Sequence, residues 1–202
     1  MTRISFVSWL LLSILSPLCL AQGRVYQVTS GSKVEIHLDT SGFLGFLGDK
    51  HLIEAPIQQG RIRYISNDPG KNSVELEFSS ASLRVRDPGL EEKKRLEVQQ
   101  TMEGPQVLDV KNHPRILFKS SSVKQGKGAM EITGDLTLRG NTRKVTVLAK
   151  VNPSGPRLQA TGSSRFRQTE FGIKPVTAGG GTVRVKDEVK LTFQISADAV
   201  KE

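Results

Sequence analysis

The feature that most constrains the fold is a pair of alternating segments joined by a short turn, between Met130 and Asn152. Apolar side chains occupy every second position of each segment and polar side chains the positions between, which is the period of a half-buried β-strand. The Gly140-Asn141 pair between the segments tolerates the positive φ angles of a tight turn. The stretch therefore predicts a β-hairpin of well-specified register, with an apolar row made of Ile132, Gly134, Leu136, Leu138, Val145, Val147, Ala149 and Val151.

The same one-sided alternation recurs along the chain, and turn-forming residues separate the segments, as in Asn67-Asp68-Pro69-Gly70. About eight antiparallel strands, each apolar on one face only, must stack as a sandwich or close as a barrel. Closure leaves no exposed strand edge, and a barrel of this size is filled by side chains or holds one small apolar ligand. We expect an all-β fold, an antiparallel eight-stranded β-barrel, with further strands near 33–39, 61–66, 73–80, 115–122, 157–167 and 183–197.

One helix is predicted, from Leu90 to about Met102. Asp87 is placed to cap its N-terminus, and Pro88 would occupy the first helical position, where its missing N–H costs nothing. Gly104-Pro105 would end it. Its apolar stripe is thin, which places this short helix on the outside of a larger structure.

The first residues are typical of a secretory signal peptide and not of the fold. Arg3 precedes an almost uncharged apolar run, 4–20, and the small residue Ala21 follows it. We expect cleavage before Gln22, a single domain over 22–202 after the signal peptide of 1–21, and an exported protein, periplasmic or secreted. A membrane anchor and lipidation of Cys19 are the alternatives.

The chain carries a formal net charge of +9, which becomes +8 when Arg3 is removed. Such a balance favours anionic partners, including an anionic membrane surface. An ordinary solvated face is the alternative, because the basic residues alternate with apolar ones along the strands. We expect no nucleic-acid partner, and either a monomer or a homodimer.

The sequence contains little that indicates catalysis. The histidines His37, His51 and His113 are scattered, and the mature form holds no cysteine, so a metal site is not expected. No Gly-x-Ser-x-Gly elbow is present, and the glycines 179–181 are read as a hairpin tip. Asp49 near His51 suggests a surface hydrogen bond rather than an acid–base pair. We therefore expect no enzyme and no cofactor.

Three stretches together resemble one known family. They are Val123 to Val151, the preceding His113-Pro114-Arg115-Ile116-Leu117-Phe118-Lys119-Ser120, and the later Glu170-Phe171-Gly172-Ile173. In this order they resemble the YceI-like family, also called the polyisoprenoid-binding or lipid-binding family. The resemblance covers about 25–197, and it implies a lipocalin-like antiparallel barrel that is exported, non-enzymatic and holds an isoprenoid or other amphiphilic lipid.

A lipid-binding barrel would line its cavity and mouth with branched and aromatic side chains. The glycine-rich loop between Thr40 and His51 carries Phe43 and Phe46, and we expect this loop to act as a lid or a membrane-touching lip, with a plug as the alternative. A solidly packed barrel with a basic binding surface, in a cell-envelope interaction protein, is the second hypothesis. The expected ligand-binding residues are Val34, Ile36, Phe43, Phe46, Leu76, Phe78, Phe118, Ile132, Leu136, Phe171, Leu191 and Phe193.

Overall fold

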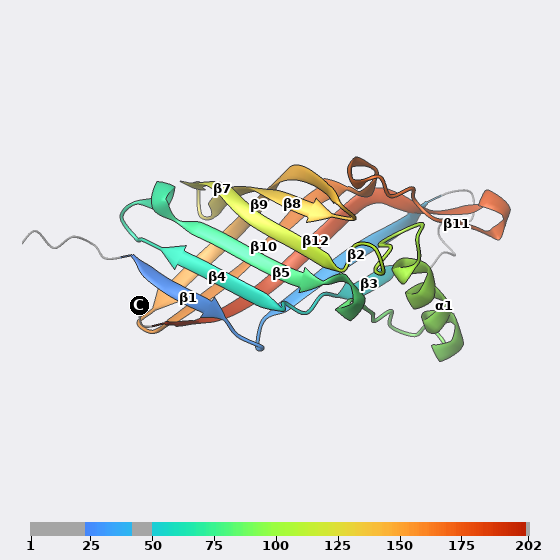
Figure 1. Ribbon diagram of the computed structural model, residues 1–202, viewed down its shortest axis with the longest axis horizontal. Coiled ribbons are helices and arrows are strands. Elements are labelled where there is room, and N and C mark those ends of the chain that lie inside the picture. The colour runs from blue at the N-terminus through green and yellow to red at the C-terminus, as the bar shows by residue number, and fades with distance from the viewer. Residues whose placement is uncertain (1–22, 42–49, 201–202) are drawn as a thin grey trace, which may run out of the picture.

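Strand pairing closes the chain into a barrel in the computed structural model, which describes residues 23–41 and 50–200 (Figure 1). The ring runs β1-β4-β5-β7-β8-β9-β10-β12, and β12 pairs in turn with β1. Every pairing in the ring is antiparallel, as the alternation predicted. The predicted eight-stranded antiparallel barrel is confirmed.

The strands follow the alternating segments, with four short strands, β1, β3, β6 and β11, that the sequence pattern did not reveal. The elements are β1 (Arg24–Val28), β2 (Lys33–Ser41), β3 (His51–Glu54), β4 (Gln59–Tyr64), η2 (Pro69–Lys71), β5 (Ser73–Ser79), η3 (Ser80–Ser82), β6 (Arg84–Val85), α1 (Glu92–Glu103), β7 (Arg115–Gln125), β8 (Met130–Leu138), β9 (Asn141–Ser154), β10 (Arg157–Arg167), η4 (Gln168–Phe171), β11 (Thr177–Ala178), η5 (Gly179–Gly181) and β12 (Val183–Ala199).

The long strand β12 pairs with β10 along one edge and changes partner along the other edge. Its first part pairs with β2, and its last residues pair with β1, where Tyr26 faces Ala199. The chain changes partner at Ser196, whose carbonyl accepts hydrogen bonds from the Thr29 N–H at 2.9 Å and from the Ser32 hydroxyl at 3.1 Å. Because β2 continues to β3 and β6, the wall of the barrel extends past the ring at the end where α1 lies (Figure 1).

The predicted hairpin is β8 and β9, and its register is the expected one. Ile132 faces Val147 and Gly134 faces Val145 across the pair. Gly134 is needed on this row because a Cβ there would lie 2.6 Å from the ring of Phe118. The turn places Arg139 at φ 49° and Gly140 at φ 71°, the left-handed values that a two-residue hairpin turn requires.

The start of the helix differs from the prediction. α1 begins at Glu92 with Glu91 as N-cap, and Gly104 ends it as predicted. Asp87 is buried and does not cap the helix, because its carboxylate accepts hydrogen bonds from His51 and from the backbone of Leu52. Pro88 belongs to a turn with Gly89, whose φ of 79° is incompatible with a helical start.

α1 covers the free edge of β6. The side chain of Gln99 accepts a hydrogen bond from the Val85 N–H at 2.8 Å and donates to the Leu83 carbonyl at 2.9 Å. These bonds satisfy backbone groups that an edge strand would otherwise expose. The helix therefore completes the wall of the barrel where the strands end.

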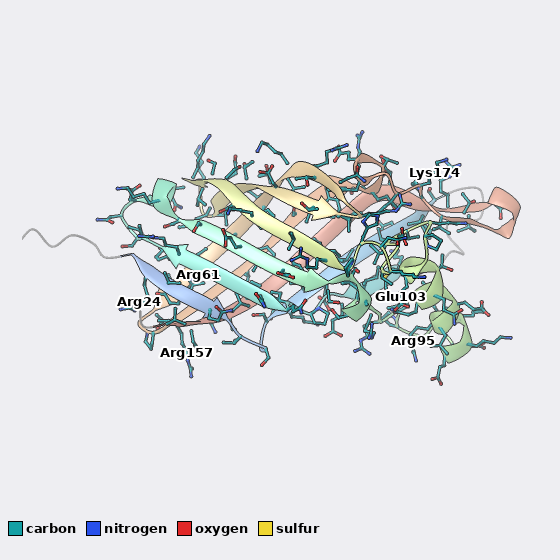
Figure 2. All side chains as sticks on the ribbon, in the orientation of Figure 1. Arg24, Arg61, Arg95, Glu103, Arg157 and Lys174 are labelled. Carbon is teal, nitrogen blue, oxygen red and sulfur yellow. The ribbon has the colours of Figure 1, made fainter. Side chains whose placement is uncertain are left out.

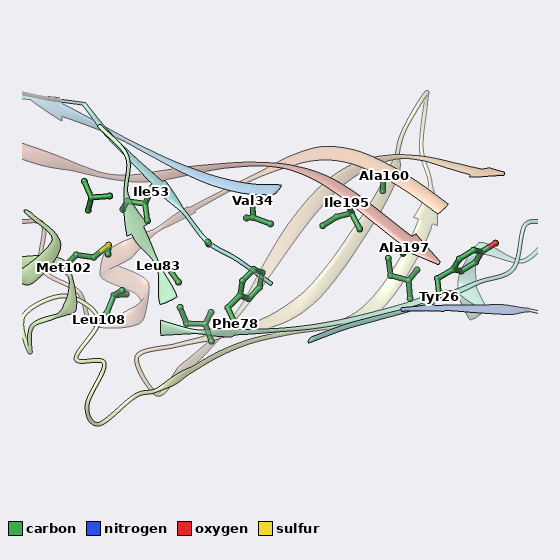
Figure 3. Close-up of a cluster of buried hydrophobic side chains, with 14 of the residues drawn as sticks. Tyr26, Val34, Ile53, Phe78, Leu83, Met102, Leu108, Ala160, Ile195 and Ala197 are labelled. Carbon is green, nitrogen blue, oxygen red and sulfur yellow. The ribbon is translucent and has the colours of Figure 1, made fainter. Parts of the chain in front are cut away.

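The interior is mostly apolar along its whole length. Figure 3 follows a cluster of buried side chains from Met102 and Leu108 at the α1 end to Tyr26 and Ala197 at the β1 end. Charged side chains lie on the outside of the barrel (Figure 2), many in cross-strand ion pairs such as Lys119–Glu75 at 2.9 Å and Lys144–Asp135 at 3.1 Å. The outer face therefore carries both positive and negative side chains, although the chain as a whole has a net positive charge.

Candidate ligand-binding cavity

The α1 end of the barrel holds a cavity of about 610 Å³, here called the mouth chamber. Its walls come from β2, β3, β6, β12, α1 and the loop after α1. Exposed residues of α1, Lys94, Glu97 and Thr101, are part of its lining, so the chamber reaches the surface beside this helix. Five of the predicted ligand-binding residues line it, namely Val34, Ile36, Phe78, Leu136 and Leu191.

A second cavity of about 130 Å³, here called the inner chamber, lies deeper in the barrel. Four further predicted residues line it: Leu76, Phe118, Ile132 and Phe193. The two chambers share five lining side chains, which we call the waist: Val34, Phe78, Leu136, Phe166 and Leu191. A ligand tail that entered the mouth chamber would meet these side chains before it reached the inner one.

Phe171 is placed differently from the expectation. It is fully buried in η4, lines neither chamber, and packs edge-on against Phe166 with ring centroids 5.4 Å apart. It therefore supports a waist residue from behind instead of facing the cavity. Phe43 and Phe46 lie outside the described residues.

Several lining residues come from segments without strand alternation. Val107 and Leu108 follow α1, Ile173 follows η4, and Met102 is the buried residue of α1. Met102 lies at the end of the predicted helix and Ile173 in the third stretch of the family resemblance, but the sequence pattern assigned neither to the cavity. Val107, Leu108 and Ile173 line the chamber because of the way their loops cross the barrel end, and no local sequence pattern predicts that.

Polar side chains gather at the mouth chamber, whose walls are otherwise apolar. The described ones are Thr40, His51, Lys94, Glu97, Thr101 and Gln168. Gln168 is held in place because its amide donates to the Lys186 carbonyl at 2.7 Å. An apolar chamber with a few polar groups in its lining, three of them exposed on α1, suits a molecule with a hydrocarbon tail and a polar end.

His51 is oriented by a buried carboxylate. Its Nδ1 lies 2.7 Å from Oδ2 of Asp87, and the other carboxylate oxygen accepts the Leu52 N–H at 2.7 Å. The Asp87 side chain is only 2% exposed. Asp49, which the sequence suggested as the neighbour of His51, lies outside the described residues, and the partner found here is 36 positions away along the chain.

Two features are absent from the described residues. Residues 23–41 and 50–200 hold no group of three or more side chains that could bind a metal ion. The same residues contain no helix of the length and apolarity needed to cross a bilayer.

Comparison with known proteins gives a family match. The model of the YceI-like domain matches residues 26–197. A UPF0312 protein from Pseudomonas syringae pv. tomato is 27% identical over 142 residues, which cover 67% of this chain and 68% of that protein. One from Pseudomonas putida (strain W619) is 34% identical over 102 residues, covering 47% of this chain and 49% of the relative, so the match spans about half the length of that protein.

Solved structures share the fold. BcnA of Burkholderia cenocepacia superimposes with a TM-score of 0.59 at 20% identity, over 82% of this chain and 95% of that one. The YCEI protein of Campylobacter jejuni gives a TM-score of 0.54 at 12% identity, over 74% and 82%. With the family model matched over nearly all of the barrel, the chain belongs to the YceI-like domain family.

Proposed function

We propose that this protein is a non-enzymatic binding protein that holds an isoprenoid or another amphiphilic lipid inside its barrel. The observation that carries the proposal is the mouth chamber, whose volume of about 610 Å³ lies in the range of small-molecule sites. Its walls are branched, aliphatic and aromatic side chains, which a hydrocarbon tail needs. Its polar side chains lie where the polar end of an amphiphile would remain.

The open chamber favours this proposal over a solidly packed barrel that acts through its surface. Several basic residues outside the barrel are paired with acidic neighbours, as in Arg86–Glu54 at 2.8 Å, which reduces the field that an anionic partner would meet. Contact with an anionic membrane surface remains part of the proposal only as a way of approaching the lipid.

We further propose that the protein is exported and that Gln22 is the mature N-terminus. The support is the charged start, the apolar run and Ala21 in the sequence. N-terminal sequencing of protein recovered from the exported fraction tests this directly. Retention of Arg3, or a lipid on Cys19, would contradict it.

Lipid binding is tested by mass spectrometry of an organic extract of the purified protein, and by displacement of N-phenyl-1-naphthylamine with farnesol. Leu191→Trp places a large ring in the waist and should abolish displacement while the barrel stays folded. Leu148→Trp is the matched control, because Leu148 is 51% exposed on the outside of β9. Equal binding by both variants, or no extracted or displacing lipid, would count against the proposal.

A further inference from the structure

The imidazole of His51 separates a buried carboxylate from the mouth chamber. His51 lines the chamber and Asp87 does not. Asp87 accepts two hydrogen bonds, at 2.7 Å from Leu52 N and at 2.7 Å from His51 Nδ1. A carboxylate has no proton to donate, so the hydrogen of this pair sits on Nδ1 of the imidazole.

This arrangement fixes the chemistry that His51 offers. With the hydrogen on Nδ1, the neutral ring keeps Nε2 as a hydrogen-bond acceptor. Among the hydrogen bonds of the described residues, Nδ1 has a partner and Nε2 has none. The chamber therefore presents one oriented acceptor nitrogen among mostly apolar walls, where a hydrogen bond discriminates strongly because unpaired polar groups are costly.

The charges around the chamber disfavour an anionic ligand. The described charged residues of the lining are Lys94 and Glu97, which lie three positions apart on α1 and offset each other. Asp87 adds a negative charge directly behind the imidazole. A phosphate or carboxylate would find the charges of Lys94 and Glu97 offset and would be repelled by the field of Asp87 behind the ring, whereas a hydroxyl group would meet no repulsion.

We infer that His51 Nε2 accepts a hydrogen bond from a neutral hydroxyl at the polar end of the ligand, with Asp87 as a positioning residue that sets the tautomer. The inference rests on the proposed lipid binding and names the ligand class: long-chain or isoprenoid alcohols, not their phosphates. His51 is the residue that selects this end of the molecule.

The test compares farnesol, its methyl ether and farnesyl phosphate as competitors of N-phenyl-1-naphthylamine. The ether has the same tail and no hydroxyl hydrogen, so the wild-type protein should bind farnesol roughly threefold to tenfold more tightly, the usual value of one hydrogen bond. Farnesyl phosphate should bind no more tightly than farnesol. His51→Phe should remove the preference and keep affinity for the ether.

Asp87→Asn gives the readout that a structural role would not produce. The amide oxygen would face Leu52 N–H, and the amide nitrogen would donate to His51 Nδ1, which moves the ring hydrogen to Nε2. The ring would then donate, and the ether should gain on farnesol. His37→Phe is the control, because His37 faces outward on β2, opposite Leu52, and contacts the Thr192 hydroxyl at 3.2 Å.

The outcomes separate this inference from the lipid-binding proposal. Equal affinity of the wild-type protein for farnesol and its ether, a preference that survives His51→Phe, or tighter binding of the phosphate would overturn the role of His51 while leaving lipid binding intact. Failure of all three competitors, with no lipid extracted, would overturn both. The wild-type comparison stands even if a variant does not fold.

Discussion

Arg139 fastens the turn of the β8–β9 hairpin to Gly172, because its Nη1 donates to the Gly172 carbonyl at 2.6 Å. Its Nη2 donates to the Pro105 carbonyl at 2.7 Å. One guanidinium thus ties the hairpin to the segment after η4 and to the segment after α1, both of which supply walls of the mouth chamber through Ile173 and Leu108. The turn is therefore part of the cavity's support as well as of the hairpin.

Arg139→Ala should loosen this end of the barrel. Two carbonyls lose a charged donor, which should lower the free energy of unfolding by about 1–3 kcal/mol because the site is partly exposed. Affinity for an amphiphile should fall as well, since the walls lose their tie. Thermal melts and probe displacement measure both effects.

Arg143→Ala is the matched control, because that guanidinium donates only to the carbonyl of its neighbour Thr142 among the described residues. If both variants lost stability and affinity alike, the tie made by Arg139 would have no special role.

The register of β8 makes opposite predictions for adjacent residues. Leu136 lines both chambers, whereas the Thr137 hydroxyl lies outside, 2.8 Å from that of Thr142. Leu136→Asp would place an unpaired charge in the apolar interior and should unfold the domain, while Thr137→Asp should cost about 1 kcal/mol or less. Circular dichroism melts of the two variants decide this, and similar losses would mean that the register is wrong.

Gly162 is required by the close approach of two strands. A Cβ there would lie 2.0 Å from the Leu148 carbonyl oxygen and 2.5 Å from Cζ of Phe193. Gly162→Ala should therefore destabilise the barrel by about 2 kcal/mol or more, because backbone cannot move aside as a side chain can. Gly70→Ala is the control, since its nearest contact would be an ordinary 3.6 Å. A melting temperature unchanged by Gly162→Ala would contradict the packing described.

The ion pair between Asp39 and Lys190, 2.8 Å long, predicts a pH dependence. The hydrogen bond from Lys190, with the nearby charge of Lys186, holds the pKa of the Asp39 carboxyl below its ordinary value. A lowered folded-state pKa stabilises the protein above the unfolded pKa, and this contribution disappears as pH falls through the folded value. Asp39→Asn should thus lower the free energy of unfolding at neutral pH by less than about 1 kcal/mol, and the melting temperature slightly. At strongly acid pH the substitution should change neither.

How far the sequence predicts the molecule depends on the range of the contacts. The period of two predicted the strands β8, β9, β10 and β12, and the inward faces of β8 and β9, because strand alternation is a local property. Asp87 was misassigned because its partner His51 is 36 positions away on β3, and an Asp beside Pro88 gives the same local pattern whether it caps a helix or accepts hydrogen bonds from a distant residue. Phe171 is apolar, which predicts burial. Its packing against Phe166, and not into the cavity, depends on the position of η4, which the sequence does not show.

The waist predicts how tail length is limited. In the wild-type protein, affinity should rise with tail length by about 0.8 kcal/mol for each CH₂ that is buried in the mouth chamber. Once the tail reaches the waist, affinity should stop rising. Leu191→Ala widens the passage to the inner chamber, so affinity should continue to rise for longer alcohols. Probe displacement by a series of straight-chain alcohols measures the length at which each curve levels off.

Leu148→Ala on the outer face is the control, and its curve should coincide with that of the wild-type protein. Because Leu191 lines both chambers, its truncation should cost less than the full penalty of a sealed core position, so the variant should remain folded. If the levelling point of Leu191→Ala matched the wild-type value, the waist would not be the limit, and tail length would have to be set in the mouth chamber itself.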